Sequence, residues 1–197
     1  MSNREVYQRQ AKAYAAGRDT SLFERPWLER VLADVPKGGA VLDLGCGAGA
    51  PIGLYLAEQG YDVTGVDYAP AMLALYARNL PDARVIEADM RSLSLDRHFD
   101  AIIGWGSFFH LTQEDQRAAL PNIARHLAPG GRLLLTVGPG AGEVWGTVAG
   151  EKVYHASLSP EDYAEVLLAA GTPVEAFVPE DAGCRGHSLL LASRPIL

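Results

Sequence analysis

The sequence predicts an α/β protein in which helices cover both faces of a mostly parallel β-sheet. Short apolar stretches alternate with helical stretches between residues 40 and 138. The strand stretches are almost continuously apolar, which is typical of strands buried on both faces. This alternation predicts three layers, α/β/α. With 197 residues, of which 48% are hydrophobic, the chain is expected to form one domain with a full core.

Two helices are expected in the first forty residues. Tyr7, Ala11 and Tyr14 recur at helical spacing in the first. The second is expected to begin near Ser21 and to end before Pro36.

Five strands and three helices are expected next. The predicted strands are AVLDL (40–44), DVTGVD (62–67), RVIEAD (84–89), FDAIIGW (99–105) and RLLLTVG (132–138). The helices are expected at 52–59, at 70–80 and from Thr112 to near Leu127. Thr112 is suited to cap its helix because two acidic residues follow in the first turn.

The last sixty residues change in character. Residues 139–158 are rich in glycine and are expected to form a long loop, which would be functional or mobile. Ser159 followed by Pro160 predicts the start of another helix. Two strands then follow at 173–179 and 187–193, and because no helix separates them they should pair as an antiparallel hairpin.

Composition narrows the range of partners, compartments and metal sites to expect. The net charge is −7 and no basic cluster occurs, so nucleic acid is not the expected partner. No apolar run reaches the roughly 18 residues of a membrane helix, and the polar first residues lack a signal-peptide core, so we expect a cytoplasmic protein. Cys46 and Cys184 are too few for a disulfide framework or a zinc signature, and no metal is expected.

The strongest motif is the glycine loop after the first strand, VLDLGCGAG at 41–49. Glycines between a strand and a helix allow a tight turn and let a ligand approach the backbone. Asp43 precedes Gly45 by two residues and suits a ligand with an ammonium group better than a pyrophosphate. The Gly-x-Gly-x-Gly spacing, with Ala50 next, also differs from the dinucleotide pattern. Asp67 ends the second strand 22 residues after Gly45, where an acid binds ribose hydroxyls.

This set of motifs resembles the class I S-adenosylmethionine-dependent methyltransferase family. The likeness covers residues 38–138: VLDLGCGAG is similar to the first motif, VTGVD to the second, EADM to the third and LAPGGRLLLTVG to the segment that enters the fifth strand. It implies a Rossmann-like three-layer α/β/α sandwich with a mostly parallel seven-stranded sheet and an antiparallel last strand. It also implies S-adenosyl-L-methionine as cofactor and S-adenosyl-L-homocysteine as product. Together with the acidic charge and a compact C-terminal part without a large added recognition domain, the motif set predicts a small-molecule acceptor.

The resemblance implies a cofactor site. The loop would surround the methionine part, Asp67 would bind both ribose hydroxyls, Tyr68 and Met72 would flank the adenine, and Asp89 would accept from its amino group. Simpler roles stay open: Asp89 can cap a short helix, and Met72 can belong to the core. The matching residues are Asp43, Gly45, Cys46, Gly47, Gly49, Asp67, Tyr68, Met72, Asp89, Met90, Trp105 and Gly106.

The acceptor should bind beyond the fourth strand, at residues 104–110, because ligands of open α/β sheets lie at the carboxyl ends of strands. This segment lacks the Asn/Asp-Pro-Pro-aromatic motif of methylases that act on DNA bases or protein amides. Its aromatic side chains suit an apolar or planar acceptor, although one of Phe108 and Phe109 is expected in the core. His110 is the candidate base, unless it only bonds the start of the next helix.

The predicted domain, residues 1–197, has three parts. Residues 1–37 form a helical lid, 38–138 the cofactor-binding core, and 139–197 the acceptor-side loop, helix and hairpin. Tyr14 and Arg18 from the lid would reach the methionine carboxylate. The candidate acceptor contacts are Trp27, Phe109, Tyr154 and His155.

Other functions on the same fold stay open. They are a non-catalytic S-adenosylmethionine-binding scaffold, a nicotinamide-dependent oxidoreductase and an aminopropyl transferase. Asp43 and the glycine spacing argue against nicotinamide, and the absence of acids just after the fourth strand argues against aminopropyl transfer.

Overall fold

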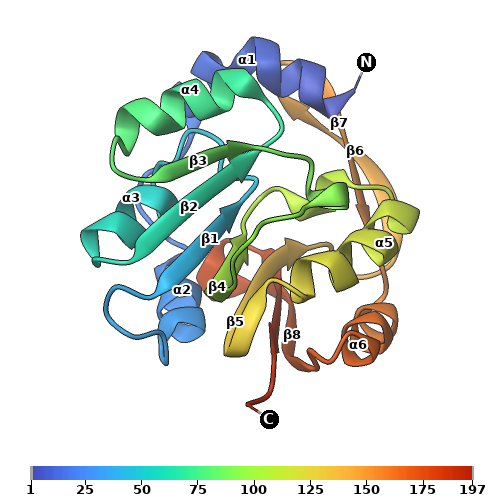
Figure 1. Ribbon diagram of the computed structural model, residues 1–197. Coiled ribbons are helices and arrows are strands. Elements are labelled where there is room, and N and C mark those ends of the chain that lie inside the picture. The colour runs from blue at the N-terminus through green and yellow to red at the C-terminus, as the bar shows by residue number, and fades with distance from the viewer. Residues whose placement is uncertain (1, 197) are drawn as a thin grey trace.

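The computed structural model describes residues 2–196. It shows one large sheet with helices on both faces, which makes three layers (Figure 1). The order of its strands is β3-β2-β1-β4-β5-β9-β8, and β9 runs antiparallel to both of its neighbours. The mostly parallel seven-stranded sheet with an antiparallel last strand is therefore confirmed. The strands are β1 Ala40–Leu44, β2 Asp62–Asp67, β3 Arg84–Glu87, β4 Phe99–Gly104, β5 Leu127–Val137, β8 Val174–Asp181 and β9 His187–Ser193.

Side chains that alternate along the strands build a core on each face of the sheet. Leu42 and Leu44 of β1 belong to a buried cluster with α5 (Gln113–Ala124) and α6 (Pro160–Ala169). Val41 belongs to a second cluster on the opposite face, with α2 (Arg25–Leu32) and α3 (Ile52–Glu58). Asp43, two residues from Val41, therefore faces the α2–α3 side.

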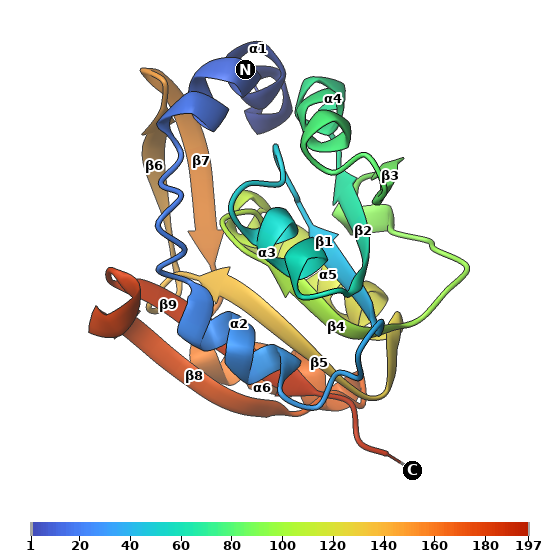
Figure 2. The same cartoon turned by 90° about the vertical axis from the view of Figure 1, so that its left-hand side faces the viewer.

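Two helices remain, α1 (Asn3–Gly17) and α4 (Pro70–Asn79), and they pack against each other. In Figure 2, α1 lies across the top of the molecule between α4 and two further strands, β6 (Gly142–Val148) and β7 (Glu151–Ser157). Ser2 and Glu5 form a capping box that fixes the start of α1: Glu5 N–H donates to Ser2 Oγ, and Ser2 N–H donates to Glu5 Oε2 at 2.8 Å. Three short 3₁₀ turns, Met90–Ser92, Phe108–His110 and Ala182–Cys184, complete the described elements.

The capping predictions are confirmed. Thr112 Oγ1 accepts from Asp115 N–H at 3.1 Å at the start of α5, and Ser159 Oγ accepts from Asp162 N–H at 3.1 Å at the start of α6. Two helix bounds differ from expectation by more than one residue. α2 begins at Arg25, four residues after Ser21, with proline in its first turn, and α5 ends at Ala124 because β5 already begins at Leu127.

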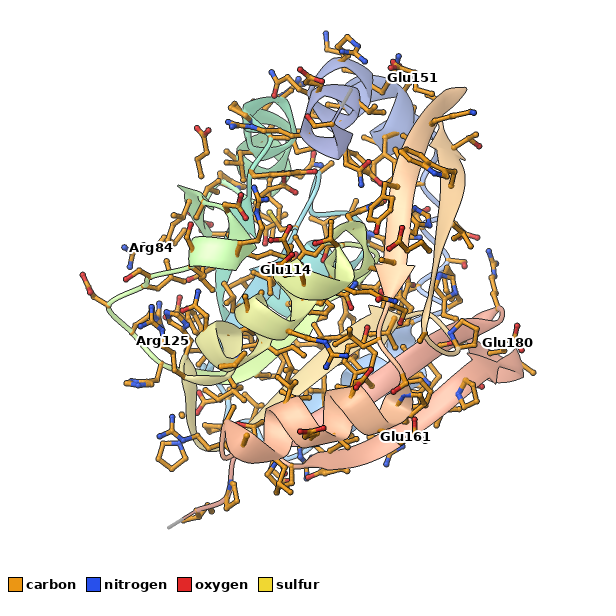
Figure 3. The ribbon with its side chains drawn as sticks, turned by 90° about the vertical axis from the view of Figure 1, so that its right-hand side faces the viewer. Arg84, Glu114, Arg125, Glu151, Glu161 and Glu180 are labelled. Atoms are coloured by element: carbon orange, nitrogen blue, oxygen red, sulfur yellow. The ribbon has the colours of Figure 1, made fainter. Side chains whose placement is uncertain are left out.

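The prediction of a long loop at 139–158 is wrong. Most of this segment is a second, two-stranded sheet, in which β6 (Gly142–Val148) pairs antiparallel with β7 (Glu151–Ser157). The turn between them has positive φ at Ala149 (48°) and Gly150 (83°), which favours a tight hairpin. The hairpin packs against α1, and Figure 3 shows Glu151 at its tip beside that helix. Gln10 Nε2 of α1 donates to Glu151 Oε1 at 2.7 Å.

Among residues 2–196, none of the helices combines the length and apolar character that crossing a bilayer requires. Cys46 and Cys184 are both buried, free thiols.

Candidate active site

A cavity of about 480 Å³ lies at the carboxyl ends of β1, β2 and β4. Its size falls within the range of about 300–1,000 Å³ that small-molecule sites occupy. Every residue that the sequence predicts for the cofactor site lines this cavity, and so do His110 and Tyr154. The cofactor-site residues are Tyr14, Arg18, Asp43, Gly45, Cys46, Gly47, Gly49, Asp67, Tyr68, Met72, Asp89, Met90, Trp105 and Gly106.

The glycine loop forms one wall of the cavity. Gly45 N–H donates to Val66 O at 2.7 Å, which ties the loop to the end of β2. A Cβ at Gly45, where φ is +71°, would lie 2.2 Å from Ser107 Cβ, so only glycine lets these two segments meet. Gly47 is open toward the cavity, and the nearest atom to a Cβ there is a Tyr14 ring carbon at 3.9 Å. The loop therefore presents bare backbone to a ligand.

Asp43 is a buried carboxylate that lacks a full set of partners. Only 4% of the residue is exposed, and Oδ2 makes no hydrogen bond. Burial, followed by the nearby charge of Asp67, raises the pKa of Asp43 to about 7, and the adjacent Tyr76 phenol partly opposes this rise. The Tyr76 hydroxyl also lacks a hydrogen bond of good geometry. A buried carboxylate is costly without a partner, so the site suits a ligand that brings a positive charge.

Asp67 ends β2 and faces the same cavity. Its Oδ2 accepts from Gly47 N–H at 3.0 Å and its Oδ1 from Ala69 N–H at 2.9 Å. These bonds fix the carboxylate and oppose the rise in the pKa of Asp67 that burial causes. Because each oxygen keeps a further lone pair, the fixed carboxylate can accept from two neighbouring hydroxyls.

Asp89 and Met72 each have the simpler role that the sequence leaves open, and each also lines the cavity. Asp89 Oδ1 accepts from Arg91 N–H at 2.9 Å as the cap of a 3₁₀ turn, yet Asp89 also lines the cavity. The side-chain hydrogen bond from Arg91 lowers the pKa of Asp89, so this acid is ionised at neutral pH. Met72 is 1% exposed in a cluster with Ala11 and Ala69, and it also lines the cavity.

His110 lies at the junction of three segments. Its Nε2 is 2.8 Å from the Tyr7 hydroxyl of α1, and its Nδ1 is 3.0 Å from Tyr154 O of β7. Asn3 joins the same junction, because it donates to Tyr154 O at 2.8 Å and accepts from Tyr154 N–H at 2.9 Å. The His110 ring thus bonds α1 and β7, and no bond to the start of α5 occurs among the described residues. Burial lowers its pKa to about 4, which keeps the imidazole neutral at pH 7.

A second, smaller cavity of about 250 Å³ adjoins the first. Phe109 and His155 line it, whereas Phe108 is fully buried in the core. Phe23 and His187 line it as well, although the sequence gave no signal for either. The walls shared by both cavities are Tyr7, Tyr14, Arg18, Trp105 and Gly106.

Trp27 lines neither cavity. It is a buried residue of α2, and its Nε1 donates to Asp181 Oδ2 at 2.7 Å. Tyr7, by contrast, belongs to the site without having been predicted there. A signal for it existed, because Tyr7 and Tyr14 are seven residues apart and therefore share one face of a helix.

Comparisons with known proteins agree with this geometry. A family model described as a methyltransferase domain matches residues 41–131. A dTDP-4-amino-2,3,4,6-tetradeoxy-D-glucose N,N-dimethyltransferase from Saccharopolyspora spinosa is 32% identical over 119 residues, which are 59% of this chain and 47% of that protein. A trans-aconitate 2-methyltransferase from Methylobacterium nodulans is 31% identical and covers 78% of this chain and 61% of that protein. The chain spans about half the length of most of the curated relatives it matches.

Solved structures match over nearly the whole chain. An amino pentose methyltransferase from Micromonospora echinaspora, solved with S-adenosylmethionine bound, has a TM-score of 0.73 at 26% identity and covers 96% of each chain. A TehB-like S-adenosylmethionine-dependent methyltransferase from Corynebacterium glutamicum has a TM-score of 0.70 at 28% identity and covers 97% of each chain.

Proposed function

Because the chain belongs to the class I S-adenosylmethionine-dependent methyltransferase family, we propose that it transfers the methyl group of S-adenosylmethionine to a small-molecule acceptor. The observation that carries this proposal is the buried carboxyl group of Asp43 in the wall of a cavity that the glycine loop also lines. A carboxylate in that position suits the ammonium group of the methionine part. The open backbone at Gly47 leaves room for it.

The other residues that line the cavity contact the ribose, the adenine and the methionine carboxylate of the cofactor. Asp67, fixed by two backbone hydrogen bonds, accepts from the two ribose hydroxyls. Tyr68 and Met72 flank the adenine, and Asp89 accepts from its amino group with Met90 beside it. Tyr14 and Arg18 of the N-terminal segment bind the methionine carboxylate. These roles are the ones that the family resemblance implies, and they are supported by the fact that each of these residues lines the cavity.

The reaction requires alignment more than activation. S-adenosylmethionine supplies a methyl group that is already activated by its sulfonium, and the acceptor atom must approach in line with the breaking bond. The walls common to both cavities, Trp105 and Gly106 among them, hold the acceptor and the cofactor in line. Tyr7 and Tyr14 of α1 and Tyr154 of β7 line the cavity, so both segments cover part of the site, where they would limit the access of water to the reacting atoms.

His110 accepts the acceptor's proton through Tyr7. His110 Nδ1 lies 3.0 Å from the Tyr154 carbonyl oxygen, which can only accept, and 3.0 Å from Asn3 Nδ2, which can only donate. The proposed tautomer carries its hydrogen on Nδ1, so Asn3 Nδ2 donates to the Tyr154 carbonyl alone and His110 Nε2 accepts from the Tyr7 hydroxyl. A proton passed from the acceptor to Tyr7 displaces the Tyr7 proton onto Nε2. The positive charge that His110 gains replaces the charge lost from the sulfonium, so the net charge of the cavity stays constant. Once an acceptor is known, Tyr7→Phe and His110→Gln should each lower kcat without changing the affinity for S-adenosylhomocysteine.

The proposal extends to organisation and setting. Residues 1–197 act as one methyltransferase domain with a lid at 1–37, a cofactor core at 38–138 and an acceptor side at 139–197. The net charge of −7 argues against a nucleic acid as acceptor. The buried free thiols of Cys46 and Cys184 fit a reducing compartment such as the cytoplasm.

Titration calorimetry with S-adenosylhomocysteine and with NAD tests the proposal. We expect micromolar affinity for S-adenosylhomocysteine and none for NAD. Asp67→Asn should weaken S-adenosylhomocysteine binding at least tenfold, whereas Asp82→Asn, on the exposed surface, should leave it unchanged. Binding of NAD alone would overturn the proposal in favour of an oxidoreductase. Binding of S-adenosylhomocysteine without methyl transfer to any acceptor in a metabolite screen would instead favour the scaffold.

A further inference from the structure

Aromatic rings form one wall of the smaller cavity. The rings of Phe23, Trp105 and His187 lie within contact of one another, with centroid distances of 6.2 Å for Phe23–Trp105, 5.4 Å for Phe23–His187 and 5.5 Å for Trp105–His187. They come from the segment before α2, the end of β4 and the start of β9, so three distant parts of the chain meet there. His187 is held in place by a 2.8 Å contact between its Nδ1 and Cys184 O.

A second pair of rings also lines this cavity. Phe109 and His155 are 4.7 Å apart between ring centroids, and His155 comes from β7 of the hairpin. Ring faces attract other flat rings in stacked or edge-on arrangements, and they bury large apolar areas. With Tyr7 and Tyr14, seven side-chain rings line this small volume, and they are therefore suited to hold a flat ligand.

The wall of the smaller cavity offers no unpaired charge. Among the described residues, neither Asp nor Glu lines it. Arg18, the arginine that lines it, forms an ion pair with the fully buried Glu24, and in the proposed function its remaining N–H donors bind the methionine carboxylate. Arg185, whose guanidinium lies 4.6 Å from the Phe23 ring centroid, is paired with Asp19. Burial lowers the pKa of His155, which favours its neutral form. An ammonium group or a diphosphate would therefore lack an unpaired partner here.

We propose that the smaller cavity is the acceptor site and that the acceptor is a small, uncharged molecule built on one planar aromatic ring. The inference rests on the proposed function and specifies its substrate class. Both cavities share Trp105 and Gly106, which the proposed function puts beside the transferred methyl group. The volume of about 250 Å³ suits a single ring better than a nucleotide-linked sugar. The chain would thus differ from the relatives whose names specify nucleotide-linked amino sugars.

Ligand-observed NMR on the full chain tests this inference with three probes, each titrated with and without saturating S-adenosylhomocysteine. Catechol represents the planar ring, trans-1,2-cyclohexanediol has the same two hydroxyls on a non-planar ring, and thymidine diphosphate represents the nucleotide. We expect catechol to bind at least ten times more tightly than either of the others. Phe23→Leu should weaken catechol at least fivefold and leave S-adenosylhomocysteine binding unchanged. Trp145→Leu, at an aromatic residue that is 64% exposed, should change neither.

His187→Leu serves as a second variant, and the urea midpoint of each variant shows whether it folds. Equal binding of catechol and cyclohexanediol, tighter binding of thymidine diphosphate, or full catechol binding in both Phe23→Leu and His187→Leu would overturn the inference. If the wild type did not bind S-adenosylhomocysteine, that result would instead contradict the proposed function. The titrations of the three probes without S-adenosylhomocysteine would still decide whether the cavity prefers a planar ring.

Discussion

Replacing Asp43 by asparagine should stabilise the ligand-free protein while it damages the cofactor site. The amide has nearly the shape of a protonated carboxyl group but cannot ionise. In the folded chain burial raises the pKa of Asp43 from 3.8 to about 7, so the folded state holds a proton that the unfolded state has already lost. Stability is therefore lost as pH rises from about 4 to about 7, and the full loss persists above pH 7.

The size of the effect follows from the shift in pKa. A rise of about 3 units corresponds to about 4 kcal/mol of unfolding free energy at pH 8, at about 1.4 kcal/mol per unit. About 3 kcal/mol of this develops between pH 5 and pH 8, because two pH units of that interval lie below the raised pKa. Asp43→Asn is free of this loss, so its advantage over the wild type should grow with pH.

Urea unfolding of both proteins without cofactor, at pH 5 and pH 8, measures the advantage directly. Because other groups also titrate, the informative quantity is the difference between variant and wild type at each pH. The exposed Asp82→Asn serves as the control for an Asp-to-Asn exchange outside the site. If Asp43→Asn were no more stable than the wild type at pH 8, or if its advantage were the same at both pH values, burial would not be what controls this carboxyl group.

Three further predictions concern the pH dependence of ligand affinity, a buried hydrogen bond and the glycine loop. The affinity of the wild type for S-adenosylhomocysteine, measured by calorimetry, should rise up to about tenfold per pH unit from pH 5 to pH 7. The affinity of Asp43→Asn should not change with pH. A wild-type affinity that does not change with pH would show that Asp43 does not bind the ammonium group. Tyr163→Phe should lower the unfolding free energy by about 1–3 kcal/mol in urea, because the buried Gln116 Oε1 loses its 2.6 Å hydrogen bond; an unchanged midpoint would refute this. Gly45→Ala should cost at least about 2 kcal/mol and abolish S-adenosylhomocysteine binding, since its Cβ would lie 2.2 Å from Ser107 Cβ at a positive φ; retained binding would show that the loop can move.

The hairpin at 142–157 shows where local patterns are insufficient. Its glycines weaken any strand signal, and an isolated two-stranded hairpin is marginal in water. It is held by contacts with segments far away in the chain, such as the two hydrogen bonds between Asn3 and Tyr154. Thr112 and Ser159, by contrast, were predictable as caps because capping involves only residues within one helical turn.

The sequence by itself determined the seven strands of the main sheet, the glycine loop and the acids at the ends of β1 and β2. Those features depend on local periodicity and on the rule that parallel strands end at one edge of a sheet. Only the tertiary structure decided that Tyr7 meets His110 across 103 residues, that Asp43 keeps an oxygen without a hydrogen bond, and that Trp27 lies away from both cavities. Each of these depends on how segments distant in the chain pack together, and no local pattern encodes that packing.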